Sequence, residues 1–200
     1  MCYSLNSSVG TFLIAMATVF FMYMRKTKMD LYLIPLIFTY GFIQFAEGLM
    51  WYDSSCGTIN KMGTYLAYIN LSLHVFAFGL GIYIVEKKMH GVIIGLLVSL
   101  YYLLTMPRME CSKYKDNTMY WGFYLPGYCS YVFPLCVLLC AYSSIPFRYK
   151  ILVPLWYSLC FFYFFWKQGL LEVTRGMKFL SGKYKPNLVG SLWCHIASFT

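Results

Sequence analysis

Seven long apolar segments, separated by short charged or turn-rich segments, restrict this chain more than any other feature of its sequence. They cover residues 10–24, 31–51, 62–85, 91–106, 124–142, 151–166 and 188–200. A helix that spans a bilayer needs about 20 apolar residues, and fewer where the bilayer is thin. We therefore predict an all-α fold, a polytopic transmembrane bundle of about seven helices that forms a single domain over residues 1–200.

Helices rather than barrel strands follow from the pattern inside the segments. Strands of a membrane barrel alternate apolar and polar residues, whereas LYLIPLIF at 31–38 and FFYFFW at 161–166 are almost continuously apolar. The chain is 60% hydrophobic and only 12% charged, so a soluble fold would lack the polar surface to cover its apolar side chains. The sequence therefore predicts an integral, multi-pass membrane protein whose first partner is the lipid bilayer.

The net charge of +9 does not indicate a nucleic-acid-binding protein. Its basic residues lie in short clusters between the apolar segments, where Lys and Arg anchor loops to lipid headgroups. Nucleic-acid binding would need a basic face on a soluble domain. We therefore predict no nucleic-acid partner.

The orientation rests on the first hairpin and on the cysteines. Arg25, Lys26 and Lys28 directly follow the first apolar segment and favour an outside or lumenal N-terminus, although the basic segment 167–187 argues the other way. With that orientation, four cysteines in or near the connecting segments share the N-terminal face: Cys2, Cys56, Cys111 and Cys129. Disulfides persist in oxidising compartments. Of the three pairings we predict Cys56–Cys111, with four free thiols as the alternative.

Glu47 is the only carboxylate within the seven apolar segments. Its spacing from Gln44 and Trp51 places the three side chains on one helix face. Because a charged group at the centre of a membrane helix costs roughly 2.5–3.5 kcal/mol, we predict that Glu47 points into the bundle and lines a polar pocket. We expect its partner in the third segment, the last segment or the N-terminus, with Asn70 or His74 first. The alternatives are a purely structural hydrogen bond or a side chain that reaches the interface.

Two further groups of polar residues are candidates for the same pocket. Asn70 and His74 are one turn apart in the third segment, and the last segment carries Trp193, Cys194 and His195 in the sequence SLWCHIAS. The predicted binding residues are therefore Gln44, Glu47, Trp51, Asn70, His74, Trp193, Cys194 and His195.

A zinc site is a secondary hypothesis for the cofactor. Cys, His and carboxylate side chains are zinc ligands. The candidates in the outer half or the middle of the bundle are Cys2, Glu47, His74 and His195. The sequence has no CxxC, HxxxH or HExxH motif. The zinc hypothesis therefore depends only on the types of these side chains and on their expected depth in the bundle.

Three short elements resemble a family of small multipass membrane proteins without an assigned activity. The chain opens MCYS, carries QFAEGLMW at 44–51 and ends near SLWC at 191–194. These match the family's Met-Cys-aromatic-Ser start, its Gln-x-x-Glu-Gly-x-x-Trp element in the second helix and its Ser-x-Trp-Cys element in the last. The resemblance implies seven helices and the importance of these residues, and it implies no particular reaction.

Three functions fit this pattern, and they leave open whether the protein is an enzyme. The first is a binding or transport protein whose pocket around Glu47 and His74 takes a small molecule, a proton or a metal ion. The second is a non-catalytic scaffold or assembly protein whose polar residues lock helices together. The third is an intramembrane zinc-dependent hydrolase. Hydrolases related to alkaline ceramidases and adiponectin receptors use several histidines, whereas only His74 and His195 lie deep here.

Overall fold

The computed structural model describes residues 4–106, 108–115 and 118–123. These residues form four helices, α1 (Leu5–Arg25), α2 (Lys28–Tyr52), α3 (Thr58–Glu86) and α4 (Met89–Leu104), and a hairpin of β1 (Lys113–Lys115) and β2 (Thr118–Tyr120). The four helices coincide with the first four apolar segments, so the helical prediction is confirmed there. The fifth, sixth and seventh predicted helices fall outside the described residues.

Three of the helices have the length and composition of membrane spans. Helices α1, α2 and α3 contain 21, 25 and 29 residues and are apolar enough to cross a bilayer, while α4 is apolar but has only 16 residues. Helix α1 also exposes large apolar side chains along its length, among them Leu13, Ile14 and Phe20. Such an outward apolar surface is compatible with lipid as the outer solvent.

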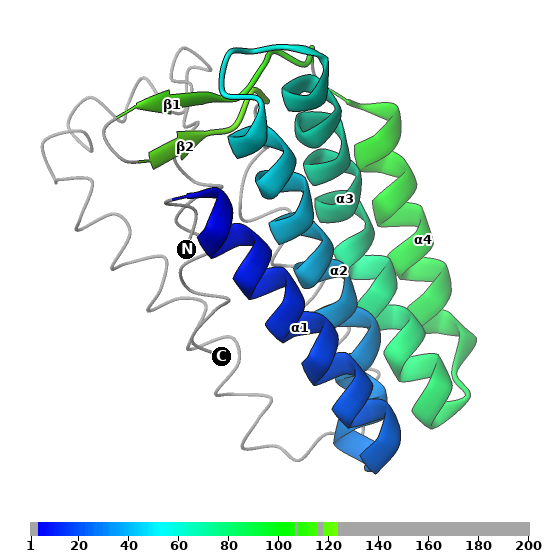
Figure 1. Ribbon diagram of the computed structural model, residues 1–200. Coiled ribbons are helices and arrows are strands. Elements are labelled where there is room, and N and C mark those ends of the chain that lie inside the picture. Colours follow the sequence, from blue (N-terminus) through cyan, green and yellow to red (C-terminus); the bar gives the residue numbers. More distant parts are fainter. Residues whose placement is uncertain (1–3, 107, 116–117, 124–200) are drawn as a thin grey trace, which may run out of the picture.

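The four helices lie side by side in chain order and form one layer (Figure 1). Connections of two residues join α1 to α2 and α3 to α4, and a five-residue connection joins α2 to α3, so neighbouring helices run antiparallel. The first residues of α1, the connection 53–57 and the hairpin all lie at one end of the layer, called the hairpin end below (Figure 1). In the hairpin, Tyr114 of β1 is opposite Met119 of β2.

Capping residues extend two helices, α1 and α2, beyond their apolar segments. The Ser4 hydroxyl accepts a hydrogen bond from the Ser7 N–H at 3.2 Å, so α1 begins five residues before the apolar segment that predicted it. Thr27 and Asp30 form a reciprocal capping box at the start of α2. Hydrophobicity alone misplaced these ends, because hydrogen bonds to unpaired backbone N–H groups decide where a helix starts. Helix α4 instead ends at Leu104, two residues before the predicted end.

Glycines permit the close approach of neighbouring helices. A Cβ atom on Gly79 would collide with the carbonyl of Gly91, and one on Gly95 would lie 2.7 Å from the Cα of Phe76. Helix association in lipid depends on such tight backbone packing by small residues. The layer is therefore assembled by close packing of α3 against α4 rather than by large interlocking side chains alone.

Polar contacts fasten the end of the layer opposite the hairpin. The Arg25 guanidinium pairs with the Asp30 carboxylate, with Nε and Oδ2 2.8 Å apart. The Tyr32 hydroxyl donates to Glu86, and the Lys28 ammonium lies 3.5 Å from the same carboxylate. These contacts join α1 to α2 and α2 to α3 where the chain turns.

Candidate functional site

Glu47 is fully buried within α2, as the sequence predicts. Its Oε1 accepts a hydrogen bond of 3.0 Å from the indole N–H of Trp121. The alternative in which the carboxylate reaches outward to the interface is therefore excluded. Trp121 was not anticipated as a partner of Glu47, because it belongs to the connection after α4. We expected a group from the third segment, the last segment or the N-terminus, with Asn70 or His74 first.

The α2 face predicted from spacing lies inside the protein. Gln44 is buried one turn before Glu47, and Trp51 is half-buried one turn after it. Tyr40 continues the same face one turn before Gln44, since residues four and seven positions apart lie above one another on a helix. Aromatic, amide and carboxylate groups therefore follow one another along a single inward stripe of α2.

His74 contributes a fully buried imidazole from α3. Its ring packs against the ring of Tyr40, with centroids 4.4 Å apart, so it lies beside the polar stripe of α2. Its Nδ1 is 2.9 Å from the backbone carbonyl oxygen of Asn70. The contact between Asn70 and His74 is thus made through the backbone of Asn70, whose side chain is only half-buried.

An apolar cluster holds Trp121 over Glu47. The indole packs against Phe123, with ring centroids 5.2 Å apart, and Phe123 in turn meets Tyr68 at 5.3 Å. The buried members of this cluster are Ile43, Ala46, Met50, Ala67, Tyr68, Leu71, Met119, Trp121 and Phe123. The segment after α4 therefore packs across α2 and α3 at the hairpin end, and Glu47 lies beneath it.

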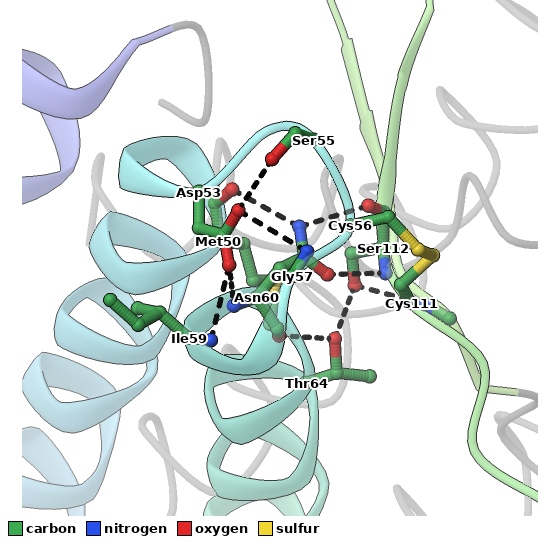
Figure 2. The surroundings of a disulfide bond; sticks show 11 residues. Met50, Asp53, Ser55, Cys56, Gly57, Ile59, Asn60, Thr64, Cys111 and Ser112 are labelled. Atoms are coloured by element: carbon green, nitrogen blue, oxygen red, sulfur yellow. Dashed lines mark hydrogen bonds between the residues drawn. A yellow bond between two sulfur atoms is a disulfide. The ribbon is translucent and has the colours of Figure 1, made fainter.

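A disulfide ties this covering segment to the connection between α2 and α3. Cys56 and Cys111 are bonded, with Cα atoms 5.4 Å apart, and Figure 2 shows the bond beside the start of α3. The predicted pairing is confirmed. The bond also confirms that these two cysteines lie at the same end of the layer, the hairpin end.

Asn60 fastens the same segment through its side-chain amide (Figure 2). Its Nδ2 donates to the carbonyl oxygens of Ser112 at 3.0 Å and Met50 at 3.2 Å, and its Oδ1 accepts from the Ser112 N–H at 2.8 Å. The Ser112 hydroxyl then meets the Thr64 hydroxyl at 2.9 Å and accepts from the Gly122 N–H at 3.0 Å. No local sequence pattern predicts this network, because Asn60 beside Lys61 is typical of an exposed loop.

Asp53 caps α3 from outside the helix (Figure 2). Its carboxylate accepts hydrogen bonds from the backbone N–H groups of Gly57, Ile59 and Asn60 at 3.1–3.2 Å and from the Ser55 hydroxyl at 2.9 Å. These donors, with the Asn60 N–H first, lower the pKa of Asp53 below its usual value, although partial desolvation opposes them. The connection 53–57 is therefore rigidly organised next to the disulfide.

The described residues contain no cluster of side chains that supports the zinc hypothesis. No group of three or more His, Cys, Asp or Glu side chains gathers there in a way that could hold a metal ion. Glu47 and His74 belong to adjacent helices. The other predicted ligands, Cys2 and His195, lie outside the described residues, as do Trp193 and Cys194.

Comparison of the chain with protein-family models, curated proteins and solved structures found no match. The functional assignment therefore depends on the geometry around Glu47.

Proposed function

We propose that this protein is a multi-pass integral membrane protein of about seven helices, with its N-terminus outside or in the lumen. In this proposal it binds or transports a small polar solute, a proton or a metal ion at a polar site around Glu47 and His74. Three helices long enough to span a bilayer support the membrane assignment. The disulfide supports an oxidising compartment at the hairpin end.

The observation that carries the functional part is the complete burial of Glu47 inside an apolar helix. It lies five residues before the end of α2, which corresponds to a depth of roughly 8 Å along the helix. Ionisable residues at such depth are costly and usually belong to substrate, ion or proton pathways. Glu47 also adjoins a stripe of polar groups rather than a single structural partner.

The covering segment gives the site an outer boundary. Trp121 lies over Glu47 at the hairpin end, and the disulfide and Asn60 hold the segment in place. A solute from the hairpin side would have to pass this segment. We infer that the segment limits access to the site and keeps bulk water from the carboxylate.

A non-catalytic scaffold is the second candidate, favoured by the same hydrogen bond. The contact between Trp121 and Glu47 joins two segments separated by 74 positions. In a scaffold, this contact would only hold the two segments together, and Glu47 would bind no solute. The two proposals differ in whether the charge of Glu47 matters for transport.

Proton flux into proteoliposomes separates these proposals. Vesicles loaded with a pH-sensitive dye and clamped with potassium and valinomycin report proton entry after an external acid pulse. Glu47→Gln retains an oxygen acceptor for Trp121 and removes the charge. We expect it to lower the flux about tenfold or more, since intramembrane carboxylates serve as proton relays. Glu110→Gln, which changes an exposed carboxylate at the hairpin end, should leave the flux unchanged.

Equal flux through the wild-type protein and correctly folded Glu47→Gln would contradict proton transport through Glu47. Flux no higher than that of empty vesicles would do the same. Either result would exclude a proton as the transported species.

A further inference from the structure

Ser8 and Gln44 stand apart from the other buried polar side chains. Ten polar or charged side chains are buried among the described residues. Eight have a hydrogen bond or ion pair: Asp30, Glu47, Asn60, Thr64, Ser72, His74, Ser99 and Ser112. In the described part of the chain, Oγ of Ser8 and Oε1 of Gln44 have none. These two atoms are therefore available to a ligand.

The Ser8 hydroxyl makes no hydrogen bond, unlike several other helical hydroxyls in the described part of the chain. Thr18, Thr64 and Ser72 each donate to the carbonyl four residues earlier, at 2.8–2.9 Å. Ser8 could use the carbonyl of Ser4 in the same way, yet its hydroxyl has no such bond. Its orientation is therefore not explained by the usual bond within the helix.

Two glycines of α2 fix the register between α1 and α2. A Cβ atom on Gly48 would lie 3.8 Å from the Val9 side chain and 3.9 Å from that of Leu5, and one on Gly41 would lie closest to the side chains of Met16 and Ala15. Gly48 is therefore level with the turn of α1 between Leu5 and Val9, and Gly41 is level with the turn that contains Ala15 and Met16.

Ser8 lies in the turn of α1 that is level with Gly48, and Gln44 lies about one turn before Gly48 on α2. At 3.6 residues per turn, each side chain is turned about 50° from the line of contact between the helices. Because the helices are antiparallel, the same rotation turns both side chains to the same side of the pair. Glu47 lies further round α2 on that side, three residues from Gln44. The two available oxygens and the carboxylate thus border one region beside α1 and α2.

The chemistry of these groups defines what can bind. The oxygen of Gln44 only accepts hydrogen bonds, the hydroxyl of Ser8 accepts as well as donates, and a carboxylate attracts positive charge. We propose that Ser8 and Gln44, with Glu47, form the subsite for a small ammonium-type cation, either ammonium itself or a small protonated amine. This inference rests on the proposed function and names its class of solute.

The stability of two serine variants provides a first test. An unpaired buried polar atom costs stability, whereas a paired one contributes to it. Ser8→Ala should therefore leave the melting temperature of the purified, full-length protein without ammonium unchanged or raised. Ser72→Ala is the matched control, because its buried hydroxyl donates to the Tyr68 carbonyl at 2.9 Å, and it should melt at a lower temperature. An equal loss in both variants would overturn the assignment of Ser8 as an available group.

The ligand response provides the second and deciding test. Ammonium chloride or methylammonium chloride replaces sodium chloride at constant ionic strength, and the melting temperature is followed. Selective binding to the folded state predicts a saturable rise of a few degrees. Ser8→Ala and Gln44→Met should abolish this rise, and Ser72→Ala should keep it.

Two outcomes would overturn the subsite: no rise with either amine, or a rise that survives in both Ser8→Ala and Gln44→Met. An absent rise together with flux that still depends on Glu47 would remove the subsite and leave the proposed function standing. Loss of both the thermal response and the flux would remove both.

Discussion

The indole N–H of Trp121 donates a 3.0 Å hydrogen bond to the carboxylate of Glu47, and both side chains are almost completely buried. The bond joins the segment after α4 to the interior of α2. A buried hydrogen bond to a charged group contributes more than one between neutral groups, and its loss leaves the other partner unsatisfied. The stability of the covering segment and the environment of Glu47 are therefore linked through one bond.

Trp121→Phe tests this link. The substitution keeps an aromatic ring in the apolar cluster and removes the N–H donor, so we expect a loss of about 1–3 kcal/mol in the free energy of unfolding. The measurement is a double-mutant cycle with Glu47→Leu, in which neither partner remains. A coupling energy of about 0.5–3 kcal/mol is expected. Additive effects of the two substitutions would show that the bond does not contribute.

The disulfide should stabilise the covering segment strongly. It closes a sequence separation of 55 residues, and a bond of this kind contributes about 2–4 kcal/mol, chiefly by restricting the unfolded chain. Cys56→Ser, Cys111→Ser and the double variant should lose the same stability, because each opens the same bond. Trp121 fluorescence should shift as the segment loosens. A double variant that loses about twice as much as either single variant would indicate separate roles for the two thiols.

The contact between α3 and α4 can be tested with two glycines that differ only in surroundings. Gly79→Ala places a methyl group against the Gly91 carbonyl, whereas nothing lies within 4 Å of the corresponding position on Gly10. We expect Gly79→Ala to destabilise the protein by about 1–3 kcal/mol through overpacking. Gly10→Ala should instead stabilise it by roughly 0.5–1 kcal/mol through helix propensity. Thermal unfolding of both variants checks the prediction, and equal effects would contradict the packing of these helices.

Asp53 should make the hairpin end sensitive to acid. Hydrogen bonds from the Asn60 N–H and its neighbours lower the pKa of Asp53 in the folded state. A carboxylate whose pKa is lowered in the folded state stabilises the protein at pH values above its unfolded-state pKa, which is about 3.9 for aspartate. That contribution is lost as the pH falls through the folded-state pKa. The wild-type protein should therefore lose its advantage over Asp53→Asn in this acidic range, as measured by unfolding at each pH. A difference that does not change with pH would contradict the charged cap.

Local physical effects explain which features the sequence predicted. The apolar segments located α1 to α4, and the cost of exposing a carboxylate to lipid predicted the burial of Glu47. The shared face of Cys56 and Cys111 followed from helix parity, and the disulfide bears it out. Each of these inferences depends on neighbouring residues or on the number of crossings.

Contacts between distant segments explain what the sequence did not predict. Trp121 lies among charged and turn residues, so the segment resembled an ordinary basic connection rather than a cover for α2 and α3. Asn60 and Ser112 are 52 positions apart, and no local pattern links them. The alternation of Met119, Trp121 and Phe123, all buried, was the available signal, because every second residue of an extended segment faces the same side.

The accessibility of position 44 to a small polar reagent tests the central claim of a polar intramembrane site most directly. The cysteines other than Cys56 and Cys111 are replaced by serine, and Gln44→Cys and Phe45→Cys are compared in proteoliposomes. Aminoethyl methanethiosulfonate, a small cation, is added from the aqueous phase, and modification is followed by mass. Gln44 is buried on the polar face, whereas its neighbour Phe45 is 40% exposed on the outer apolar surface. The account predicts that the thiol at 44 reacts, that ammonium chloride slows this reaction, and that the thiol at 45 stays unmodified. An inert thiol at 44, or equal reaction at 45, would contradict it.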